Sequence, residues 1–187
     1  MNIEIDKTLQ ILQNGGTILY PTDTIWGIGC DPANPEAVQK IYEIKKRDDR
    51  KSMLVLIDSV SMLTSYITDV PNIAYELIGV TDKPLTIVYP GARNLAANLI
   101  AEDGSLGIRV TIDPFCQQLI RRFGRPIVST SANQSGETSP ATFREISEKI
   151  INSVDYVVDW RRDEQTGKVS SSIIKIDIKG YFKILRP

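Results

Sequence analysis

Helical and strand-like patterns alternate along the chain, and this alternation constrains its fold more than any other feature. Apolar residues recur at helical spacing from Ile5 to Leu12, a glycine pair at 15–16 ends that helix, and 17–20 then has the apolar character of a buried strand. Further short strands are predicted at 53–57, 85–89, 106–110, 127–129, 156–158, 172–177 and 181–185. Because the last three have no helix between them, the pattern predicts an α/β fold with a single twisted mixed β-sheet and helices packed on it.

Three helices carry start signals in the sequence. The Asn-Pro pair at 34–35 and the Asp-Pro pair at 113–114 each place an N-capping side chain before a proline at the first helical position. Thr142 and Glu145 have the spacing of a capping box. That box predicts a third helix, with the apolar residues between 143 and 150 on one face.

The composition excludes several catalytic classes. The chain of 187 residues contains no histidine, which rules out Ser-His-Asp and Cys-His catalysis, a histidine general base and HExxH zinc sites. Its 22 Lys and Arg balance 23 Asp and Glu, for a formal charge of −1, and this near-neutral value disfavours a simple nucleic-acid binder. Chemistry near pH 7 must therefore rest on carboxylates, Lys, Arg, hydroxyls, amides and backbone groups.

Cysteine usage and the N-terminus bear on the compartment. Cys30 and Cys116 have no CxxC spacing, so we expect two buried free thiols, with a disulfide as the alternative. The N-terminus lacks the basic and apolar regions of a signal peptide, and no run of 18 apolar residues is present. We expect a soluble cytoplasmic protein of one domain, residues 1–187, with no membrane contact.

Five segments combine glycine, hydroxyl or charged residues at expected strand ends. They are 20–29, 45–51, 129–136, 167–172 and 185–187. Segment 45–51 has five positive side chains, which fit either a phosphate-binding site or a solvated helix C-terminus. Segment 20–29 fits either a ligand-binding loop or a tight connection with Trp26 in the core. Neither a Walker A loop nor a GxGxxG is present, so a bound nucleotide would not sit as in P-loop or Rossmann proteins.

Taken in order, these segments resemble the YrdC-like family, which includes the threonylcarbamoyl-AMP synthases that start the threonylcarbamoyladenosine modification of tRNA. The resemblance extends over 15–187, from GGTILYPTDTIWGIGCDP to the terminal RP. Its most specific parts are a K-x-R pair, Lys45 and Arg47, and an S-x-N pair, Ser131 and Asn133. It implies a YrdC/RibB-like fold.

The resemblance also implies a reaction. L-Threonine, bicarbonate or CO2, and ATP give threonylcarbamoyl-AMP and pyrophosphate, with Mg²⁺ expected alongside the nucleotide and threonylcarbamoyl-transfer proteins downstream. In such a nucleotidyl transfer the protein mainly positions the reactants and neutralises charge. A site of Lys, Arg, hydroxyls and amides suits that task.

The family pattern assigns roles to individual positions. It places Thr24, Arg109 and Ser171 around the threonine, with Arg109 as a bidentate partner for its carboxylate. It gives Lys45 and Arg47 catalytic roles in one basic pocket. The ATP-facing residues are Arg47, Lys51, Ser131, Asn133 and Arg186, with Ala141 where relatives often have a hydroxyl. Ser105 and Ser129 would line the strand ends between the two sites, and no metal ligand is assigned.

The sequence departs from the family pattern at four places. PTDT, with Asp23, replaces PTET, and KKRD at 45–48 lacks the proline of the common KxRP. Leu56 stands where relatives often have a histidine at the threonine site, and TDKPLT at 81–86 replaces WPGPLT. The match ends at Pro187, so we expect no counterpart of the C-terminal extension of longer members.

Two alternatives to the synthase remain open. An RNA-binding module, with at least weak tRNA contact through the 45–51 patch, predicts steeply salt-dependent RNA binding that falls when Arg47 and Lys51 are neutralised. A family paralogue with a changed substrate predicts the same fold without threonine-dependent turnover.

Overall fold

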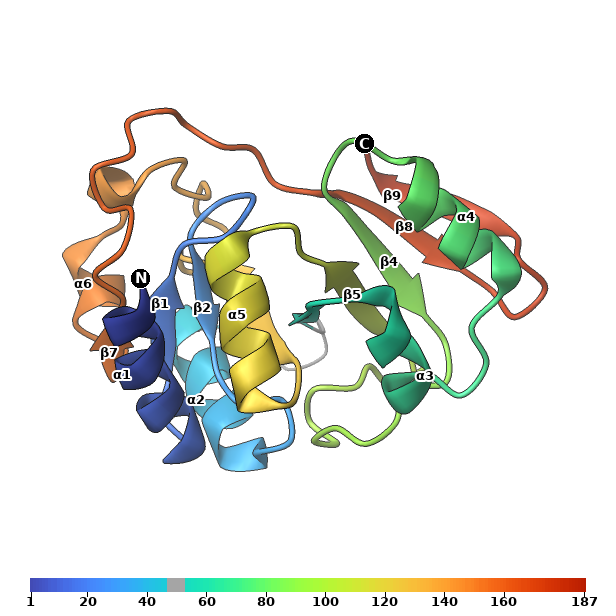
Figure 1. Cartoon of the computed structure of the whole chain (residues 1–187), viewed down its shortest axis with the longest axis horizontal. Coiled ribbons are helices and arrows are strands. Elements are labelled where there is room, and N and C mark those ends of the chain that lie inside the picture. Colours follow the sequence, from blue (N-terminus) through green and yellow to red (C-terminus); the bar gives the residue numbers. More distant parts are fainter. Residues whose placement is uncertain (47–52) are drawn as a thin grey trace.

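One mixed β-sheet runs through the molecule. The structure is a computed structural model that describes residues 1–46 and 53–187, and within these ranges nine strands form the sheet (Figure 1). The strands are β1 (Ile18–Tyr20), β2 (Gly27–Gly29), β3 (Leu54–Ile57), β4 (Leu85–Tyr89), β5 (Leu106–Val110), β6 (Ile127–Ser131), β7 (Tyr156–Val157), β8 (Ser172–Ile176) and β9 (Phe182–Arg186). Their order in the sheet is β7-β1-β2-β6-β3-β5-β4-β8-β9.

Parallel and antiparallel pairs alternate irregularly across this sheet. The pairs β1/β7, β3/β5 and β4/β8 are parallel, whereas β1/β2, β2/β6, β3/β6, β4/β5 and β8/β9 are antiparallel. The prediction of a single mixed sheet is confirmed. The apolar run at 53–57 is confirmed as a central strand, because β3 lies between β6 and β5.

Helices cover the two faces of the sheet unequally. They are α1 (Asn2–Gln13), α2 (Pro35–Lys45), α3 (Leu63–Tyr66), α4 (Asn72–Val80), α5 (Pro114–Phe123) and α6 (Glu148–Ile151), with 3-10 turns η1 (Val60–Met62) and η2 (Phe143–Glu145). On one face α1 and α5 pack on β1, β3 and β6 in one buried cluster. The larger cluster, on the other face, includes residues of α2, α3 and α4.

Side-chain alternation within the strands divides these two cores. Along β3, Val55 and Ile57 belong to the larger cluster, whereas Leu56 between them belongs to the α1/α5 cluster. Along β4, Ile87 belongs to the larger cluster, whereas Thr86 lines an open cleft. Thr86 pairs in register with Arg109, and Arg109 with Leu56, so the cleft lies on the α1/α5 face, beyond those two helices.

The predicted helix starts at 34–35 and 113–114 are confirmed. The Asn34 Oδ1 accepts hydrogen bonds from the main-chain N–H of Glu36 and Ala37, at 3.0 and 3.1 Å. The Asp113 Oδ1 accepts from the N–H of Cys116 at 3.0 Å. Each cap satisfies donors that the first helical turn leaves unpaired.

The third predicted helix is wrong. Residues after Thr142 form only the turn η2, and the chain then extends at Ile146 before the short helix α6. The Thr142 hydroxyl donates to the Glu145 Oε1 at 2.9 Å, and the other oxygen of that carboxylate accepts from the N–H of Ala141. The Thr142 hydroxyl accepts no hydrogen bond from a backbone N–H of the turn, and its contact with Glu145 joins the two side chains instead, so a capping box does not form.

Strand β2 is the main element that the sequence does not predict. Gly27–Gly29 forms a fully buried strand between β1 and β6, so only residues 21–26 of the segment 20–29 remain a loop, with Trp26 in the core. A Cβ on Gly29 would lie 2.6 Å from the carbonyl oxygen of Val128 and 2.7 Å from the Tyr20 ring. Only glycine allows the three strands to approach this closely, and glycine carries no strand signal.

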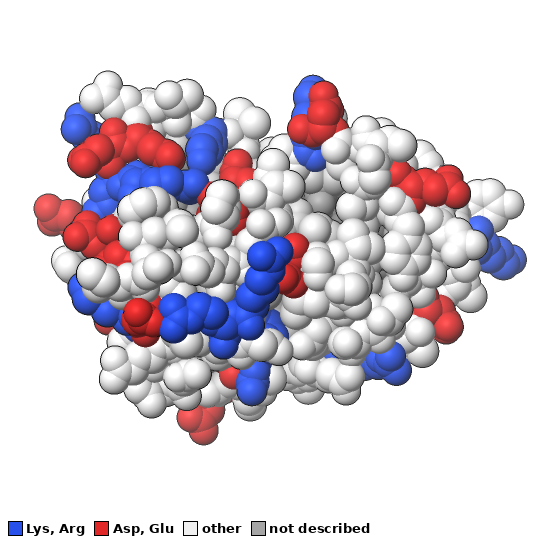
Figure 2. All heavy atoms as spheres, in the orientation of Figure 1, with Lys and Arg blue, Asp and Glu red and all other residues white. Residues whose placement is uncertain are grey.

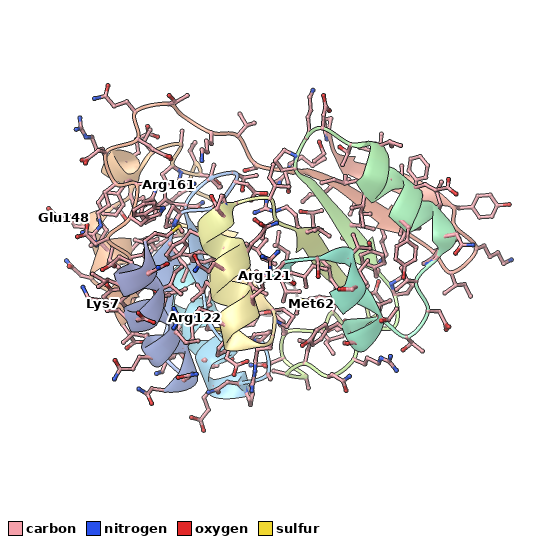
Figure 3. All side chains as sticks on the ribbon, in the orientation of Figure 1. Lys7, Met62, Arg121, Arg122, Glu148 and Arg161 are labelled. Atoms are coloured by element: carbon pink, nitrogen blue, oxygen red, sulfur yellow. The ribbon has the colours of Figure 1, made fainter. Side chains whose placement is uncertain are left out.

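Charged side chains on the α1/α5 side are largely paired. The Arg121 Nε lies 2.8 Å from Asp58, and Arg122 of the same helix forms an ion pair with Asp6 of α1 (Figure 3 labels both arginines). On the face shown in Figure 2, Lys and Arg are interspersed with Asp and Glu. Exposed pairs of this kind add little stability, but they leave no broad patch of one sign on this face.

The two cysteines are free and buried, as predicted. Burial raises the pKa of both the Cys30 and Cys116 thiols, so neither is a thiolate nucleophile at neutral pH. Among the helices of the described ranges, none has the length and apolar character needed to cross a membrane.

Candidate active site

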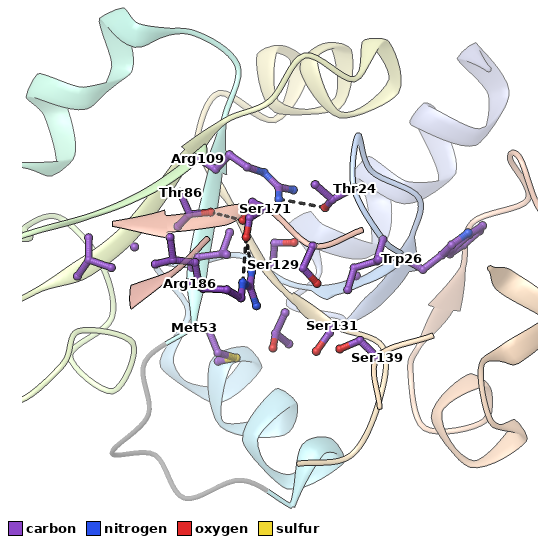
Figure 4. A pocket seen from close by; sticks show the side chains of 18 residues that line it. Thr24, Trp26, Met53, Thr86, Arg109, Ser129, Ser131, Ser139, Ser171 and Arg186 are labelled. Atoms are coloured by element: carbon purple, nitrogen blue, oxygen red, sulfur yellow. Dashed lines mark hydrogen bonds between the residues drawn. The ribbon is translucent and has the colours of Figure 1, made fainter. Parts of the chain in front are cut away.

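An open cleft of about 240 Å³ lies on the half of the sheet face that α1 and α5 leave uncovered (Figure 4). Strands β2, β3, β4, β5, β6, β8 and β9 all contribute to its walls. The lining residues are Thr24, Ile25, Trp26, Gly27, Met53, Leu54, Thr86, Val88, Gly107, Arg109, Ser129, Thr130, Ser131, Ser139, Ser170, Ser171, Ile173 and Arg186. The charged side chains among them are two arginines, and eight others are serine or threonine, on β4, β6 and the loops before β2, after β6 and before β8.

Arg109 forms the floor of the cleft. It lies on β5 and is only 3% exposed. Its Nη1 donates to the Thr24 hydroxyl at 3.0 Å, and its Nη2 lies 3.1 Å from the Asp23 carboxylate. Within the described residues the Nε has no hydrogen-bond partner. The guanidinium is therefore anchored by two residues of the PTDT loop while it retains hydrogen-bonding capacity for a ligand.

The hydroxyl hydrogen bonds beside Arg109 have a fixed direction. The Thr22 hydroxyl donates its single hydrogen to the carbonyl oxygen of Ile25 at 2.8 Å. In its 3.0 Å contact with the Thr24 hydroxyl it must therefore accept, so Thr24 is the donor there. The Thr24 oxygen already accepts from Arg109 and has one lone pair left. Toward a ligand in the cleft, Thr24 can consequently only accept a hydrogen bond.

The opposite wall joins β4, β8 and β9. The hydroxyls of Thr86 and Ser171 are 2.7 Å apart, and the Arg186 Nε and Nη2 donate to the carbonyl oxygen of Ser171 at 2.9 and 2.7 Å. Figure 4 shows Ser171 between Arg109 and Arg186. Burial, and then the charge of Arg109, lower the pKa of Arg186, but an arginine remains cationic at neutral pH. Two guanidinium groups in one cleft favour an anionic ligand.

Lys45 shapes the wall formed by the end of β6. Its ammonium group is buried and donates to the carbonyl oxygens of Ser131 and Asn133, at 2.6 and 2.7 Å. The Asn133 amide in turn donates to the carbonyl oxygens of Gln134 and Glu137, at 3.0 and 2.7 Å. These bonds hold the chain in a bend immediately after the strand, so Lys45 adds positive charge behind the serine hydroxyls and also positions them.

The structure brings most of the residues singled out by the sequence to one place. Thr24, Arg109, Ser171, Ser131 and Arg186 line the cleft, together with Ser129. Lys45 and Asn133 lie behind its wall, and Ala141 lines a small neighbouring cavity that shares Thr24 and Trp26 with the cleft. Arg47, Lys51 and the Asp48 of KKRD lie outside the described residues.

Two residues of the family comparison lie away from the lining. Leu56 pairs in register with Arg109 but is fully buried in the α1/α5 core. The Ser105 hydroxyl donates to the Asp103 carboxylate at 2.5 Å and does not line the cleft. Thr86 also lines the cleft, and the sequence did not single it out as a site residue. Its signal was the alternation of faces along 85–89, which places Thr86 and Ile87 on opposite faces of the sheet.

Within the described residues, the lining of the cleft contains no carboxylate, thiol or phenol group. Burial raises the pKa of Tyr20 well above its usual range, so its hydroxyl stays protonated. No group of three or more Cys, Asp or Glu side chains there is arranged to hold a metal ion. The cleft therefore offers guanidinium groups, hydroxyls and main-chain groups, and its chemistry is that of binding and charge stabilisation.

Two arginines in a hydroxyl-lined cleft on a mixed α/β sheet give this protein a site that suits anionic ligands. The chain belongs to the Sua5/YciO/YrdC family: the model of that family, described as "Telomere recombination", matches residues 10–187. The family predicted from the K-x-R and S-x-N pairs is thus confirmed.

Curated relatives are similar over nearly the whole chain. A threonylcarbamoyl-AMP synthase of Pseudoalteromonas translucida (strain TAC 125) is 31% identical over 179 residues, which cover 94% of each chain. A protein of the same name from Vibrio campbellii (strain ATCC BAA-1116) is 33% identical over 173 residues, or 91% of this chain and 92% of the relative.

Solved structures show the same fold. A variant of Sua5 from P. abyssi superposes with a TM-score of 0.86 at 25% identity, over 98% of this chain and 56% of that protein. This chain thus spans little more than half the length of that relative. A second structure of P. abyssi Sua5, complexed with L-threonine, gives a TM-score of 0.85 at 24% identity, over 98% of this chain and 53% of that one.

Proposed function

We propose that this chain is a threonylcarbamoyl-AMP synthase, which condenses L-threonine, bicarbonate or CO2, and ATP into threonylcarbamoyl-AMP and pyrophosphate. The observation that carries the proposal is the pair Arg109 and Arg186 in one cleft otherwise lined by hydroxyls and apolar groups. The names of the curated relatives, which are similar over more than nine-tenths of the chain, support it.

Arg109, Thr24 and Ser171 suit the threonine end of this reaction. Threonine carries a carboxylate, which matches a guanidinium, and N–H and O–H donors, which match an oxygen that can only accept. Arg109 would hold the carboxylate, and Thr24 would accept a hydrogen bond from the amino or hydroxyl group. Asp23, which stands in place of the Glu of PTET, pairs with Arg109, so this departure keeps a carboxylate beside the guanidinium.

Arg186 and the hydroxyls of β6 suit the nucleotide end. The threonine nitrogen adds to CO2 and loses a proton to water or to a carboxylate, which gives a carbamate. A carbamate oxygen then bonds to the α-phosphorus while the bond to pyrophosphate breaks, so no protein nucleophile is needed. Ser131 and Arg186 would bind phosphate oxygens, and the same role is proposed for Arg47 and Lys51. Asn133 and Ala141 would shape the nucleotide end from behind, because the Asn133 amide hydrogens and the Ala141 N–H are already donated to neighbouring oxygens. Lys45 and Arg47 would supply charge at the reacting phosphate.

Mg²⁺ enters this proposal as part of the nucleotide substrate. The described residues offer no cage of carboxylates for it, and its natural ligands are the phosphate oxygens themselves. The hydroxyls of Ser129, Ser131 and Ser139 line the cleft where such a complex would sit. When bound, the ion would neutralise phosphate charge, and no step here is assigned to it. The product would pass in the cytoplasm to proteins that transfer the threonylcarbamoyl group.

Pyrophosphate release should require threonine and bicarbonate together. The purified chain, given ATP and Mg²⁺, should form threonylcarbamoyl-AMP, detected by mass spectrometry, with a matching amount of pyrophosphate. Omitting threonine, or removing bicarbonate and CO2, should reduce release to background, because the carbamate is the attacking group. ATP turnover unchanged without threonine would exclude the synthase, and turnover restored by another amino acid would indicate a paralogue with a changed substrate.

An RNA-binding role is the alternative from a different class. The interspersed charges on the face in Figure 2 do not favour it, although the patch at 45–51 lies mostly outside the described residues. RNA binding that falls steeply with salt, without threonine-dependent turnover, would support that role instead.

A further inference from the structure

A long strap connects the two ends of the sheet. Strand β7 lies at one edge and β8 lies next to the opposite edge, so residues 158–171, here called the strap, must cross the whole sheet (Figure 1). The strap ends in Ser170 and Ser171, which line the cleft. Its path therefore affects the wall of the site.

Arg161 joins the strap to two other elements. Its Nη1 forms an ion pair with Asp113, the residue that caps α5, and that carboxylate is only 2% exposed. Its Nη2 donates to the carbonyl oxygen of Thr22 at 2.8 Å (Figure 3 labels Arg161). The planar fork of an arginine can serve both partners at once, which an ammonium cannot do with the same geometry.

The backbone conformation and the ion pair of Arg161 both lower the stability of the folded state. Its backbone has a φ of 59°, a left-handed conformation that residues other than glycine rarely adopt. A shielded ion pair also loses hydration that its attraction only partly offsets. Strained backbone and shielded charge at one residue are typical of a functional constraint.

A short series of hydrogen bonds leads from Arg161 to the cleft. Arg161 holds the Thr22 carbonyl, the Thr22 hydroxyl accepts from the Thr24 N–H and hydroxyl, and Thr24 accepts from Arg109. Lys168, further along the strap, also donates to the Thr22 carbonyl at 3.2 Å. The strap thus fixes the main chain of the loop that carries both partners of Arg109.

We propose that Arg161 is a positioning residue for the threonine subsite, acting through Thr22 on Thr24 and Arg109. This inference rests on the proposed synthase function. Arg161 does not touch the substrate. Arg161 positions the loop that carries Thr22 and Thr24, and Asp113 in turn positions Arg161.

Arg161→Gln tests this directly. The glutamine cannot bridge Asp113 and Thr22, so the KM for threonine should rise by about tenfold or more, whereas kcat and the KM for ATP stay within about twofold. Asp113→Asn should give the same threonine-specific rise, because asparagine still caps α5 but no longer pairs with a cation. The double variant should be no worse than either single one, since both remove the same contact.

Arg162→Gln is the matched control. Arg162 lies next in the strap, donates to the carbonyl oxygens of Val157 and Val158 and lies over the Phe143 ring, without contacting Thr22. Its replacement should leave the KM for threonine within about twofold of the starting value. Thermal unfolding of each variant identifies any general loss of structure.

Two outcomes would overturn the inference. One is a KM for threonine unchanged in both Arg161→Gln and Asp113→Asn. The other is an equal rise for threonine and ATP, which would indicate general loosening of the structure. The unaltered chain is assayed alongside, with threonine binding measured by calorimetry. If it neither binds threonine nor forms product, the proposed function fails, and this result is distinct from an active chain whose variants are unaffected.

Discussion

Arg109→Lys should lower kcat/KM for threonine by about 100-fold. Lysine keeps a positive charge opposite Asp23, so the buried carboxylate is not left unpaired. It loses the planar fork that serves Thr24, Asp23 and a substrate carboxylate together, and such a replacement is not conservative at a bidentate site. A loss of about 100-fold corresponds to about 2.8 kcal/mol, within the range of charge-assisted hydrogen bonds.

Steady-state assays of pyrophosphate release at varied threonine, with ATP saturating, measure this loss. Arg125→Lys is the matched control, because the half-exposed Arg125 lies away from the cleft and its Nη1 is 2.8 Å from the carboxylate of the largely buried Asp31. It should change kcat/KM by less than about twofold. Arg109→Ala is a poorer test, because leaving Asp23 buried and unpaired lowers the stability of the fold by about 3–5 kcal/mol. A loss of activity in that variant could then come from unfolding as well as from weaker threonine binding. Equal kcat/KM values for Arg109→Lys and Arg125→Lys would contradict the assignment of Arg109 to the threonine site.

Gly29→Ala should destabilise the fold strongly. The added methyl group would lie 2.6 Å from the carbonyl oxygen of Val128, a backbone atom of the neighbouring strand, and 2.7 Å from the Tyr20 ring. Neither can retreat freely, because Tyr20 is fully buried and Val128 belongs to a central strand. Forcing volume into a well-packed region costs about 1–3 kcal/mol, or more where backbone must move. We expect the melting temperature to fall by about 5 °C or more.

Gly79→Ala provides the matched comparison for that experiment. Gly79 lies in α4, and a Cβ there meets no atom within 4 Å. Alanine is a better helix former than glycine, so the free energy of unfolding of this variant should rise by about 0.5–1 kcal/mol. Calorimetry or circular dichroism follows both transitions. If the Gly29→Ala protein had the same melting temperature as the unaltered chain, β1, β2 and β6 would not be packed as closely as described.

The sequence predicted the elements whose own residues carry a signal. The apolar runs at 85–89 and 106–110 became β4 and β5 with the same limits, and Asn34 caps α2 as its position before a proline indicated. Strand β2 was not predicted because the requirement for glycine there is steric. Two glycines in a local sequence favour a loop, and only the neighbouring strands in the folded protein leave no room for a side chain. The helices between 63 and 80 were also not predicted.

The site shows the same limit. The resemblance named the residues of the cleft, but not how they hold one another. Nothing in the local sequence links Arg161 to Thr22, which are 139 positions apart, or Asp23 to Arg109. Such pairs depend on strand order, and order is set by the packing of the whole sheet. The direction of the hydrogen bonds at Thr24 also follows only from three-dimensional partners.

The β8–β9 hairpin has a consequence for the way the protein is made. Ser171 and Arg186 are synthesised after β1 to β7, yet they form one wall of the cleft. A ribosome-bound chain that has folded β1 to β7 still lacks that wall. The complete cleft can therefore assemble only after the end of β9 has left the ribosome, and the proposed reaction would be confined to chains that have emerged through β9.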